Sequence, residues 1–381
     1  MIPFIDLTRQ HAALREELGA AVARVLDSSQ FVLGTEGKTL EGELAALCGV
    51  RWALGVASGT DALRLALSAL GVGPGAEVIT PAFSFVASAS TILMVGATPV
   101  FVDCERRTGN IDIDAIENKI TPRTRAISIV HFLGMPVDMV RINAIARKHN
   151  LFVLEDAALA VGTKLDGVHA GLHGDVGVFS FYPVKHITTA EGGMVITRNE
   201  DLARRIRLAR AFSIDRPHGE RKVPGTYDAI GLGFNYRMSE IHAAIGIEQM
   251  KRVSSFLEQR RRNDTALRSR LAGDDRFTLL ETTGGRFVSS YYCLSIMLRP
   301  DLAAKRADII EKVNALGVGT SVYYPAPVPR MSYYRNKFGY DAEAYPNAAW
   351  ISDCSIALPV GPHLDEVDMA HIAGVIKEAA R

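Results

Sequence analysis

Short apolar runs rich in β-branched residues alternate with helical patterns between residues 52 and 197, and this alternation most narrows the possible folds. Residues 52–57 form such a run, and the stretch that follows repeats leucine at helical spacing. Residues 151–156 are almost continuously apolar, as expected for a strand that helices cover on both faces. We therefore predict an α/β domain in which a mainly parallel sheet lies between two layers of helices.

The pattern changes after about residue 250, where a long charged helix is expected at residues 251–271. Two strands, two further helices and an irregular segment rich in Pro and Tyr are expected after it: residues 291–298 and 319–324, residues 301–316 and 365–380, and residues 325–346. A chain of 381 residues is too long for one ordinary core. We predict a large α/β domain over residues 1–250 and a smaller α+β domain over residues 251–381.

Composition argues against several classes of protein. A formal net charge of +1 provides no overall field that would attract nucleic acid or an anionic membrane, so neither is expected as a partner. The four cysteines are far apart and lack the spacing of metal ligands, so no metal site is predicted. The first residues lack the basic and apolar regions of a secretory signal. The apolar stretch at residues 91–102 is shorter than the roughly 20 residues of a membrane helix. We expect a cytoplasmic protein.

Ligands of an open parallel sheet bind beyond the carboxyl ends of its strands, and the first such end carries the sequence Ser58-Gly59-Thr60-Asp61. The glycine allows close approach of the backbone to a ligand. The following helix start offers free N–H groups and Thr60 adds a hydroxyl, a combination that suits a phosphate. The same sequence is also typical of a plain helix N-cap provided by Thr60 or Asp61.

A carboxylate and a lysine follow two further strands. Asp156 ends a buried strand, and such a carboxylate beside a pyridine nitrogen keeps that nitrogen protonated, although a structural cap or ion pair is the alternative. Lys185 lies between two apolar strands, where desolvation makes an amine nucleophilic, although a salt bridge is the alternative. A phosphate loop, a ring-nitrogen partner and an imine-forming lysine together predict a site for pyridoxal 5′-phosphate (PLP).

Six longer motifs extend over most of the chain: FVLGTEGKTLEGELAAL at 31–47, SGTDAL at 58–63, TPAFSFVASA at 80–89, LEDAALAVG at 154–162, GDVGVFSFYPVKHITTAEGGMVIT at 174–197 and GFNYRMSEIHAAIGIEQM at 233–250. Through them the chain resembles the sugar aminotransferases of the DegT/DnrJ/EryC1/StrS group, a branch of the fold-type I PLP enzymes. The long lysine motif is the most specific of the six. The resemblance implies the three-layer PLP transferase fold with a smaller C-terminal domain.

The resemblance also implies roles for single residues around the cofactor. Lys185 would form the Schiff base and act as the acid–base group, and Asp156 would pair with the pyridine nitrogen. The remaining cofactor contacts would come from the phosphate loop, a serine hydroxyl and a stacking aromatic ring: Gly59, Thr60, Asp61, Ser180 and Phe85. Asn235 would reach the cofactor phosphate of a neighbouring subunit, which implies a homodimer with shared active sites.

The expected function is transfer of an amino group, by resemblance from glutamate, to a nucleotide-linked ketosugar. Candidate substrate contacts are Tyr182, His186, Tyr323 and the segment 31–34, each of which also has an ordinary interpretation as a packing or hydrogen-bonding residue. Two residues depart from the family pattern. Leu159 stands where the family has Gln or His and is expected to be a packing residue, and Tyr323 stands where many members have His.

Three alternatives are left open. A sugar dehydratase of the same family would, by resemblance, have histidine in place of Lys185. A non-catalytic regulatory protein with this fold would have no need for the lysine, the carboxylate and the phosphate loop together. A nicotinamide-dependent oxidoreductase would need a G-x-G-x-x-G turn after the first strand, and the sequence lacks it there.

Overall fold

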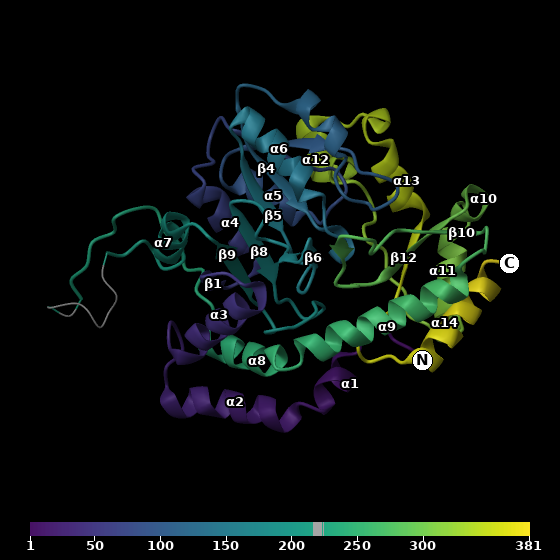
Figure 1. The fold of residues 1–381 in the computed structure, drawn as a ribbon, viewed down its shortest axis with the longest axis horizontal. Helices are drawn as coiled ribbons and strands as arrows, with labels where there is room; N and C mark the ends of the chain where they lie inside the picture. Colours follow the sequence, from purple (N-terminus) through teal and green to yellow (C-terminus); the bar gives the residue numbers. More distant parts are fainter. Residues whose placement is uncertain (216–222, 224) are drawn as a thin grey trace.

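A seven-stranded sheet forms the centre of the computed structural model, which describes residues 1–215, 223 and 225–381 (Figure 1). The strands in spatial order are β1 (Trp52–Val56), β9 (Gly193–Thr197), β8 (Val176–Ser180), β5 (Phe152–Asp156), β4 (Thr124–Val130), β2 (Glu77–Pro81) and β3 (Thr98–Val102). Only β9 runs antiparallel to the other strands of this sheet. The predicted mainly parallel sheet is therefore confirmed.

Side chains along the strands alternate between two apolar cores, one on each face of the sheet. One core packs strand residues against α4 (Gly59–Ala69), α5 (Ala87–Met94) and α7 (Glu200–Ala209), and its strand residues include Leu54, Val56, Leu154, Val178 and Val195. Opposite-facing residues pack against α3 (Thr35–Cys48), α6 (Met139–His149) and α8 (Glu240–Met250), and these include Ala53, Val153, Phe179, Met194 and Ile196. Because both faces are covered, the three-layer α/β prediction is confirmed.

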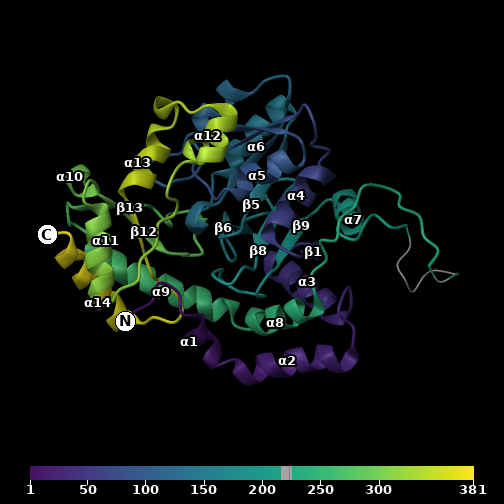
Figure 2. The same ribbon diagram turned by 180° about the vertical axis from the view of Figure 1, so that it is seen from behind.

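A second, antiparallel sheet lies in the C-terminal part of the chain and consists of β10 (Phe277–Leu279), β12 (Leu294–Leu298) and β13 (Ser355–Leu358). Its core is shared with the helices α9 (Val253–Leu271), α11 (Arg306–Ala315) and α14 (Glu366–Ala379). Both views show α9 extending from α8 towards these C-terminal helices (Figures 1 and 2). The first residues also join this part, because Ile2 exchanges two backbone hydrogen bonds with Gly317 and Gly319. The boundary at residue 250 stays a prediction.

The remaining elements are short or peripheral. The N-terminal helices are α1 (Leu7–Ala12) and α2 (Arg15–Ser28), and α2 lies alongside α8. A small sheet is formed by β6 (Lys164–Leu165), β7 (Val168–His169) and β11 (Phe287–Val288). Further helices in the C-terminal part are α10 (Pro300–Ala303), α12 (Ser332–Phe338) and α13 (Pro346–Cys354). Within the described ranges, no helix has both the length and the apolar character that crossing a membrane requires.

Two predictions for the C-terminal part were wrong. Residues 319–324, all of them described, form no regular strand, and Ser321 makes only an isolated bridge to Ala357. Pro325 has no N–H with which to extend a ladder, and Tyr323 and Tyr324 pack into an aromatic cluster instead. The segment 325–346 is less irregular than expected because it contains α12, which lies between its first three prolines and Pro346.

Candidate active site

The polar strand ends predicted from the sequence meet at one edge of the sheet. Strands β1, β5 and β8 are parallel, so Ser58, Asp156 and Ser180 all lie at their carboxyl ends. The segment 181–192, which carries Lys185, links β8 to the antiparallel β9 and therefore lies at the same edge. The fold thus brings together residues that are more than 120 positions apart in the sequence.

The start of α4 packs directly against the end of β8. Ser58 caps this helix, because its hydroxyl accepts a hydrogen bond from the Asp61 N–H (3.1 Å) and lies 2.9 Å from the Asp61 carboxylate. The cap is therefore Ser58, and neither Thr60 nor Asp61 fills that role. A Cβ on Gly59 would lie 2.8 Å from the Ser180 Cβ, so only glycine fits there without displacement. This close approach places the Ser180 hydroxyl beside the free N–H groups of the helix start.

Asp156 presents a buried carboxylate at the end of β5, with 6% of its surface exposed. Its Oδ1 accepts a hydrogen bond from the Ala158 N–H at 3.0 Å, and Ser88 donates a further one. Burial raises the pKa of Asp156, while the Ala158 hydrogen bond and the nearby Lys185 amine act in the opposite direction. The carboxylate is therefore held in place at the sheet edge, and the positive charge of Lys185 stabilises its ionised form.

Lys185 is only half-buried as a residue, yet burial of its amine lowers the pKa to about 8. The charge of Asp156 raises this pKa and so partly opposes the effect of burial. The Nζ atom also lies 5.9 Å from the ring centroid of Tyr292. An amine with a pKa near 8 is partly unprotonated around neutral pH and can act as a nucleophile or a base.

A second carboxylate, not predicted as a site residue from the sequence, belongs to Glu155 directly before Asp156 and is completely buried. Glu155 accepts hydrogen bonds from His131 Nε2 (3.0 Å) and from the N–H groups of Gly171 (2.8 Å), His173 (2.7 Å) and Gly174 (2.6 Å). Burial alone would raise the pKa of Glu155, but these donors outweigh it and leave the pKa lowered. The detectable signal was the pair of adjacent carboxylates at the end of an apolar strand.

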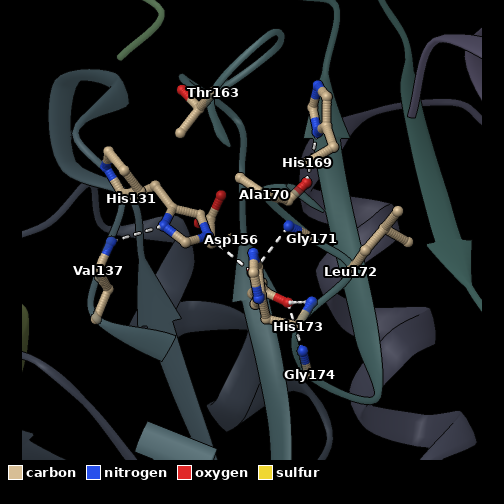
Figure 3. A network of polar contacts seen from close by, with 12 residues as sticks. His131, Val137, Asp156, Thr163, His169, Ala170, Gly171, Leu172, His173 and Gly174 are labelled. Carbon is tan, nitrogen blue, oxygen red and sulfur yellow. Dashed lines mark hydrogen bonds and ion pairs between the residues drawn. The ribbon is translucent and has the colours of Figure 1, made fainter. Parts of the chain in front are cut away.

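His131 carries its proton on Nε2, because its Nδ1 accepts a hydrogen bond from the Val137 N–H at 3.1 Å (Figure 3). Separately, the backbone N–H of His131 donates to the Asp156 carbonyl at 3.1 Å. Glu155 and His131 therefore link the ends of β4 and β5 to the segment 171–174. This network fixes the backbone from which the Asp156 side chain projects.

Aromatic side chains line the same edge. Phe85 is 57% exposed and Tyr182 48% exposed, so both are accessible to a ligand. The Phe85 ring lies 6.0 Å from that of Tyr324. Burial strongly raises the pKa of Tyr324, and the negative charge of Asp156 raises it further. Tyr323 is half-buried, and its hydroxyl is hydrogen-bonded to that of Tyr292 at 3.1 Å.

His186 is placed differently from what a substrate contact would require. It is completely buried, its Nε2 is hydrogen-bonded to the Ser290 carbonyl at 3.0 Å, and its ring packs on Tyr292. Burial and the nearby Arg260 hold its pKa well below the usual value, so it is a neutral interior side chain. The structure thus corrects this candidate in favour of the alternative of an ordinary hydrogen-bonding histidine.

Asn235 lies beside the carboxyl end of β1, the end that leads into Ser58. The segment that contains it runs along β1, where the Tyr236 carbonyl accepts a hydrogen bond from the Ala57 N–H. The Asn235 side chain accepts a hydrogen bond from Arg237 at 2.6 Å. Among the described residues there is no group of three or more His, Cys, Asp or Glu side chains that could hold a metal ion.

The model of the DegT/DnrJ/EryC1/StrS aminotransferase family matches residues 12–377. The chain belongs to this family. It is therefore an enzyme of the aminotransferase class, and the prediction of an aminotransferase is confirmed. The alternatives of a nicotinamide-dependent oxidoreductase and of a non-catalytic protein are dropped.

Three similar proteins illustrate the relationship. The UDP-N-acetyl-3-dehydro-α-D-glucosamine 3-aminotransferase of Acidithiobacillus ferrooxidans is 39% identical over 378 residues, which cover 99% of this chain and 97% of that protein. The crystal structure of S. venezuelae DesV with a ketimine intermediate has a TM-score of 0.93 and 33% identity, covering 100% of this chain and 98% of DesV. Streptococcus pneumoniae Spr1654, solved in a PLP-form, has a TM-score of 0.90 and 28% identity over 96% of both chains.

The family member described here differs from the usual pattern at Leu159, which lies in a buried apolar cluster with Phe132 and Tyr292. Its side chain adds no polar group, and only its carbonyl makes a hydrogen bond, accepted from the Ser290 hydroxyl at 2.6 Å. This placement agrees with the packing role expected for Leu159. The roles assigned to single site residues stay predictions.

Replacing Glu155 by Gln is expected to lower the free energy of unfolding at pH 7 by about 3 kcal/mol, because the amide NH₂ would face buried N–H donors and the charge would be lost. The folded-state pKa of Glu155 is lowered, so its stabilising effect is complete above the usual pKa of 4.5 and is lost as the pH falls through the folded value. Urea unfolding from pH 7 downwards should therefore show a difference between the two proteins that narrows below about pH 4.

Glu378→Gln is the matched control, because Glu378 is exposed on α14. Its midpoint should stay close to that of the unaltered protein at every pH. Equal midpoints for Glu155→Gln and the unaltered protein at pH 7 would contradict the importance of the Glu155 network.

Proposed function

We propose that this aminotransferase binds PLP at the sheet edge and transfers an amino group from glutamate to a nucleotide-linked ketosugar. The observation that carries the proposal is the pairing of two buried groups, the Asp156 carboxylate and the Lys185 amine with its pKa of about 8, at the carboxyl ends of the strands. A PLP-form of a family relative supports the choice of cofactor.

The residues present fit PLP. Asp156 would hold the pyridine nitrogen. Burial raises the pKa of Asp156 and so disfavours its ionised form, which a positively charged pyridine nitrogen beside it would stabilise. The α4 start, with Thr60 and Ser180 hydroxyls and a glycine that leaves no room for a side chain, would hold the phosphate. Phe85, exposed at this edge, would stack on the ring. When bound, PLP supplies an electron-withdrawing ring that stabilises negative charge on the carbon bearing the amine.

Lys185 would act twice. Its unprotonated Nζ would hold the cofactor, and the same nitrogen, when free, would accept and return a proton. A pKa near 8 suits both directions, because general acid–base catalysis is most efficient when the pKa of the group lies near the working pH. Asp156 contributes by keeping its negative charge in place, since it is held by Ala158 and Ser88.

The choice of acceptor is supported by a relative that is 39% identical and is named for its action on a UDP-linked dehydro sugar. The exposed aromatic side chains Phe85 and Tyr182 would offer flat apolar surface to the acceptor, and the half-buried Tyr323 is a further candidate contact. Glutamate as donor rests on the family resemblance. A cytoplasmic location also stays a prediction from the sequence.

A homodimer with shared active sites is part of this proposal. Described residues between α7 and α8 include strongly exposed apolar side chains: Val223 (61%), Ile230 (58%) and Leu232 (82%). Exposed apolar surface of this kind is typical of a protein interface. If a second copy covered this surface, Asn235, which follows these residues in the sequence, would lie close to the interface between the two subunits.

Replacing Lys185 by Ala should abolish covalent attachment of the cofactor and lower turnover by at least about 100-fold, because no other amine takes its place. Borohydride reduction followed by peptide mass spectrometry measures the attachment directly, and it should locate the cofactor on the peptide containing Lys185 in the unaltered protein only. Lys148→Ala removes an exposed lysine that pairs with Glu117 and serves as control. Normal attachment and turnover in Lys185→Ala would overturn the assignment.

Incubation with glutamate, PLP and a panel of UDP- and dTDP-linked ketosugars should give an amino sugar from at least one member, detected by mass spectrometry together with 2-oxoglutarate. A deoxy sugar as the only product would instead support the dehydratase alternative. Lys185→Ala, treated in the same way, should give neither product.

Mixing two inactive variants tests the shared sites. If Asn235 completes the site of the other subunit, a dimer of one Lys185→Ala and one Asn235→Ala subunit has one intact site and one doubly altered site. Random exchange of equal amounts should then restore about a quarter of the unaltered activity. The absence of recovery, with exchange verified by mass spectrometry of differently tagged subunits, would place Asn235 in the site of its own chain.

A further inference from the structure

Two serines of one turn bring their hydroxyl groups together beside the candidate site. The Ser84 and Ser88 hydroxyl oxygens lie 2.7 Å apart, and the two residues are 1% and 2% exposed. The neighbouring Phe83 and Ala89 belong to a buried apolar cluster. A hydroxyl group in such surroundings is costly unless it is hydrogen-bonded, and an alanine at either position would avoid that cost.

The other hydroxyl groups of α5 are used differently. Ser90 and Thr91 donate to the Ala87 carbonyl, at 3.4 and 2.8 Å, which is the common local bond of a Ser or Thr in a helix. The N-cap residue of α5 makes no side-chain capping bond, and neither Ser84 nor Ser88 supplies one. The contact between these two serines is therefore not explained by the needs of the helix itself.

Ser88 connects the pair to the carboxylate of Asp156, to which it donates a hydrogen bond. An ionised carboxylate offers only acceptors, so the hydrogen of the Ser88 hydroxyl is used on Asp156. Because a hydroxyl group has one hydrogen, the 2.7 Å contact must be donated by Ser84 to the Ser88 oxygen. The chain of bonds thus has one direction, from Ser84 through Ser88 to Asp156. In a buried setting each bond of such a chain strengthens the next.

Several other groups act on the Asp156 carboxylate. The Ala158 N–H donates to its Oδ1 at 3.0 Å, and Lys185 and His131 favour the ionised form electrostatically. The Tyr324 hydroxyl is neutral, because burial and the charge of Asp156 raise its pKa. Burial of Asp156 outweighs the favourable groups and raises its own pKa. Each hydrogen bond donated to this carboxylate therefore counts towards keeping it ionised.

The same turn also presents Phe85, the proposed stacking ring. Ser84 directly precedes Phe85, and the Ser88 N–H donates to the Phe85 carbonyl at 3.2 Å. The Phe85 ring is 57% exposed, whereas the hydroxyl groups on either side of it in the sequence are buried. One turn of the chain therefore carries both the ring that would stack on the cofactor and the hydroxyl that holds the Asp156 carboxylate.

We propose that Ser84 and Ser88 are positioning residues that hold the Asp156 carboxylate ionised and turned towards the ring nitrogen of the cofactor. The inference rests on the proposed function, because it takes PLP as the ligand of this edge. The two hydroxyl groups act on the cofactor only through Asp156. Their removal therefore weakens binding of a cofactor that has a ring nitrogen and leaves binding of one without it almost unchanged.

The first measurement compares the affinities of the full chain for PLP and for 1-deaza-PLP, in which a C–H group replaces the ring nitrogen. Ser88→Ala should weaken PLP binding by about 10-fold, the effect of losing a hydrogen bond to a charged group, and deaza-PLP binding by less than about 2-fold. Ser84→Ala should show the same pattern with a smaller loss, because it removes only the outer bond. Ser88→Thr keeps the hydroxyl and should retain the PLP affinity.

Ser90→Ala is the matched control, because it removes a hydroxyl of the same helix that bonds to the Ala87 carbonyl. It should leave both affinities unchanged. Asp156→Asn is the reference variant and should reduce the preference for PLP over deaza-PLP. In an Asp156→Asn background, Ser88→Ala should cause no further selective loss of PLP affinity, because the hydroxyl acts through that carboxylate.

The second measurement does not depend on any cofactor. Carbon-13 NMR of the chain labelled at its aspartate carboxyl groups gives the pKa of Asp156, with its signal assigned by its loss in Asp156→Asn. The Ser88 hydrogen bond lowers this pKa, so Ser88→Ala should raise it and Ser84→Ala should raise it by less. Ser90→Ala should leave it unchanged.

An equal loss of affinity for PLP and deaza-PLP in a folded Ser88→Ala protein, judged by its melting temperature, would overturn the proposal, because a packing defect acts on both. So would an unchanged pKa of Asp156 in that variant. If Ser88→Ala does not fold, Ser84→Ala decides by the same two criteria. A raised Asp156 pKa, combined with equal affinities of the unaltered protein for PLP and deaza-PLP, would retain the role of the serines in holding the carboxylate and reject the proposed role of Asp156.

Discussion

The buried carboxylate of Glu155 is the interaction on which the position of the site depends. Four donors from two separate segments converge on it, and without them a buried negative charge at the end of β5 would be strongly unfavourable. By binding His131 it joins β4 to β5, and by binding the N–H groups of residues 171–174 it holds the segment that leads into β8. The backbone of Asp156, the next residue, is therefore held by β4 on one side and by the segment that leads into β8 on the other.

Much of the fold followed from the sequence because strand alternation is a local signal. Strands β1 and β5 lie where their apolar runs predicted, within one residue, since each run is buried by helices on both faces. Residues 319–324 looked like a further strand for the same local reason. They differ because their aromatic rings pack against Phe4, Phe83 and Tyr292, which are contacts between distant parts of the chain that local patterns do not contain.

Some features of the site were likewise predictable from the sequence, and others were not. The strand-end positions of Ser58, Asp156 and Ser180 follow from parallel topology, and the structure brings them to one edge as expected. Ser58 as the actual cap of α4 and the interior positions of His186 and Arg260 could not be read from the sequence. Each depends on packing between α4, β8, α9 and the Tyr291–Tyr292 backbone, which are distant from one another in the sequence.

Three basic groups are buried near Tyr292, and burial lowers the pKa of each: Lys185, His186 and Arg260. Asp156 is the carboxylate whose charge acts on this group, through Lys185. Burial leaves His186 neutral and disfavours the protonated form of Lys185, whereas the charge of Asp156 favours that protonated form. The balance of burial against the Asp156 carboxylate leaves the pKa of Lys185 near 8, where the amine can both accept and donate a proton at neutral pH.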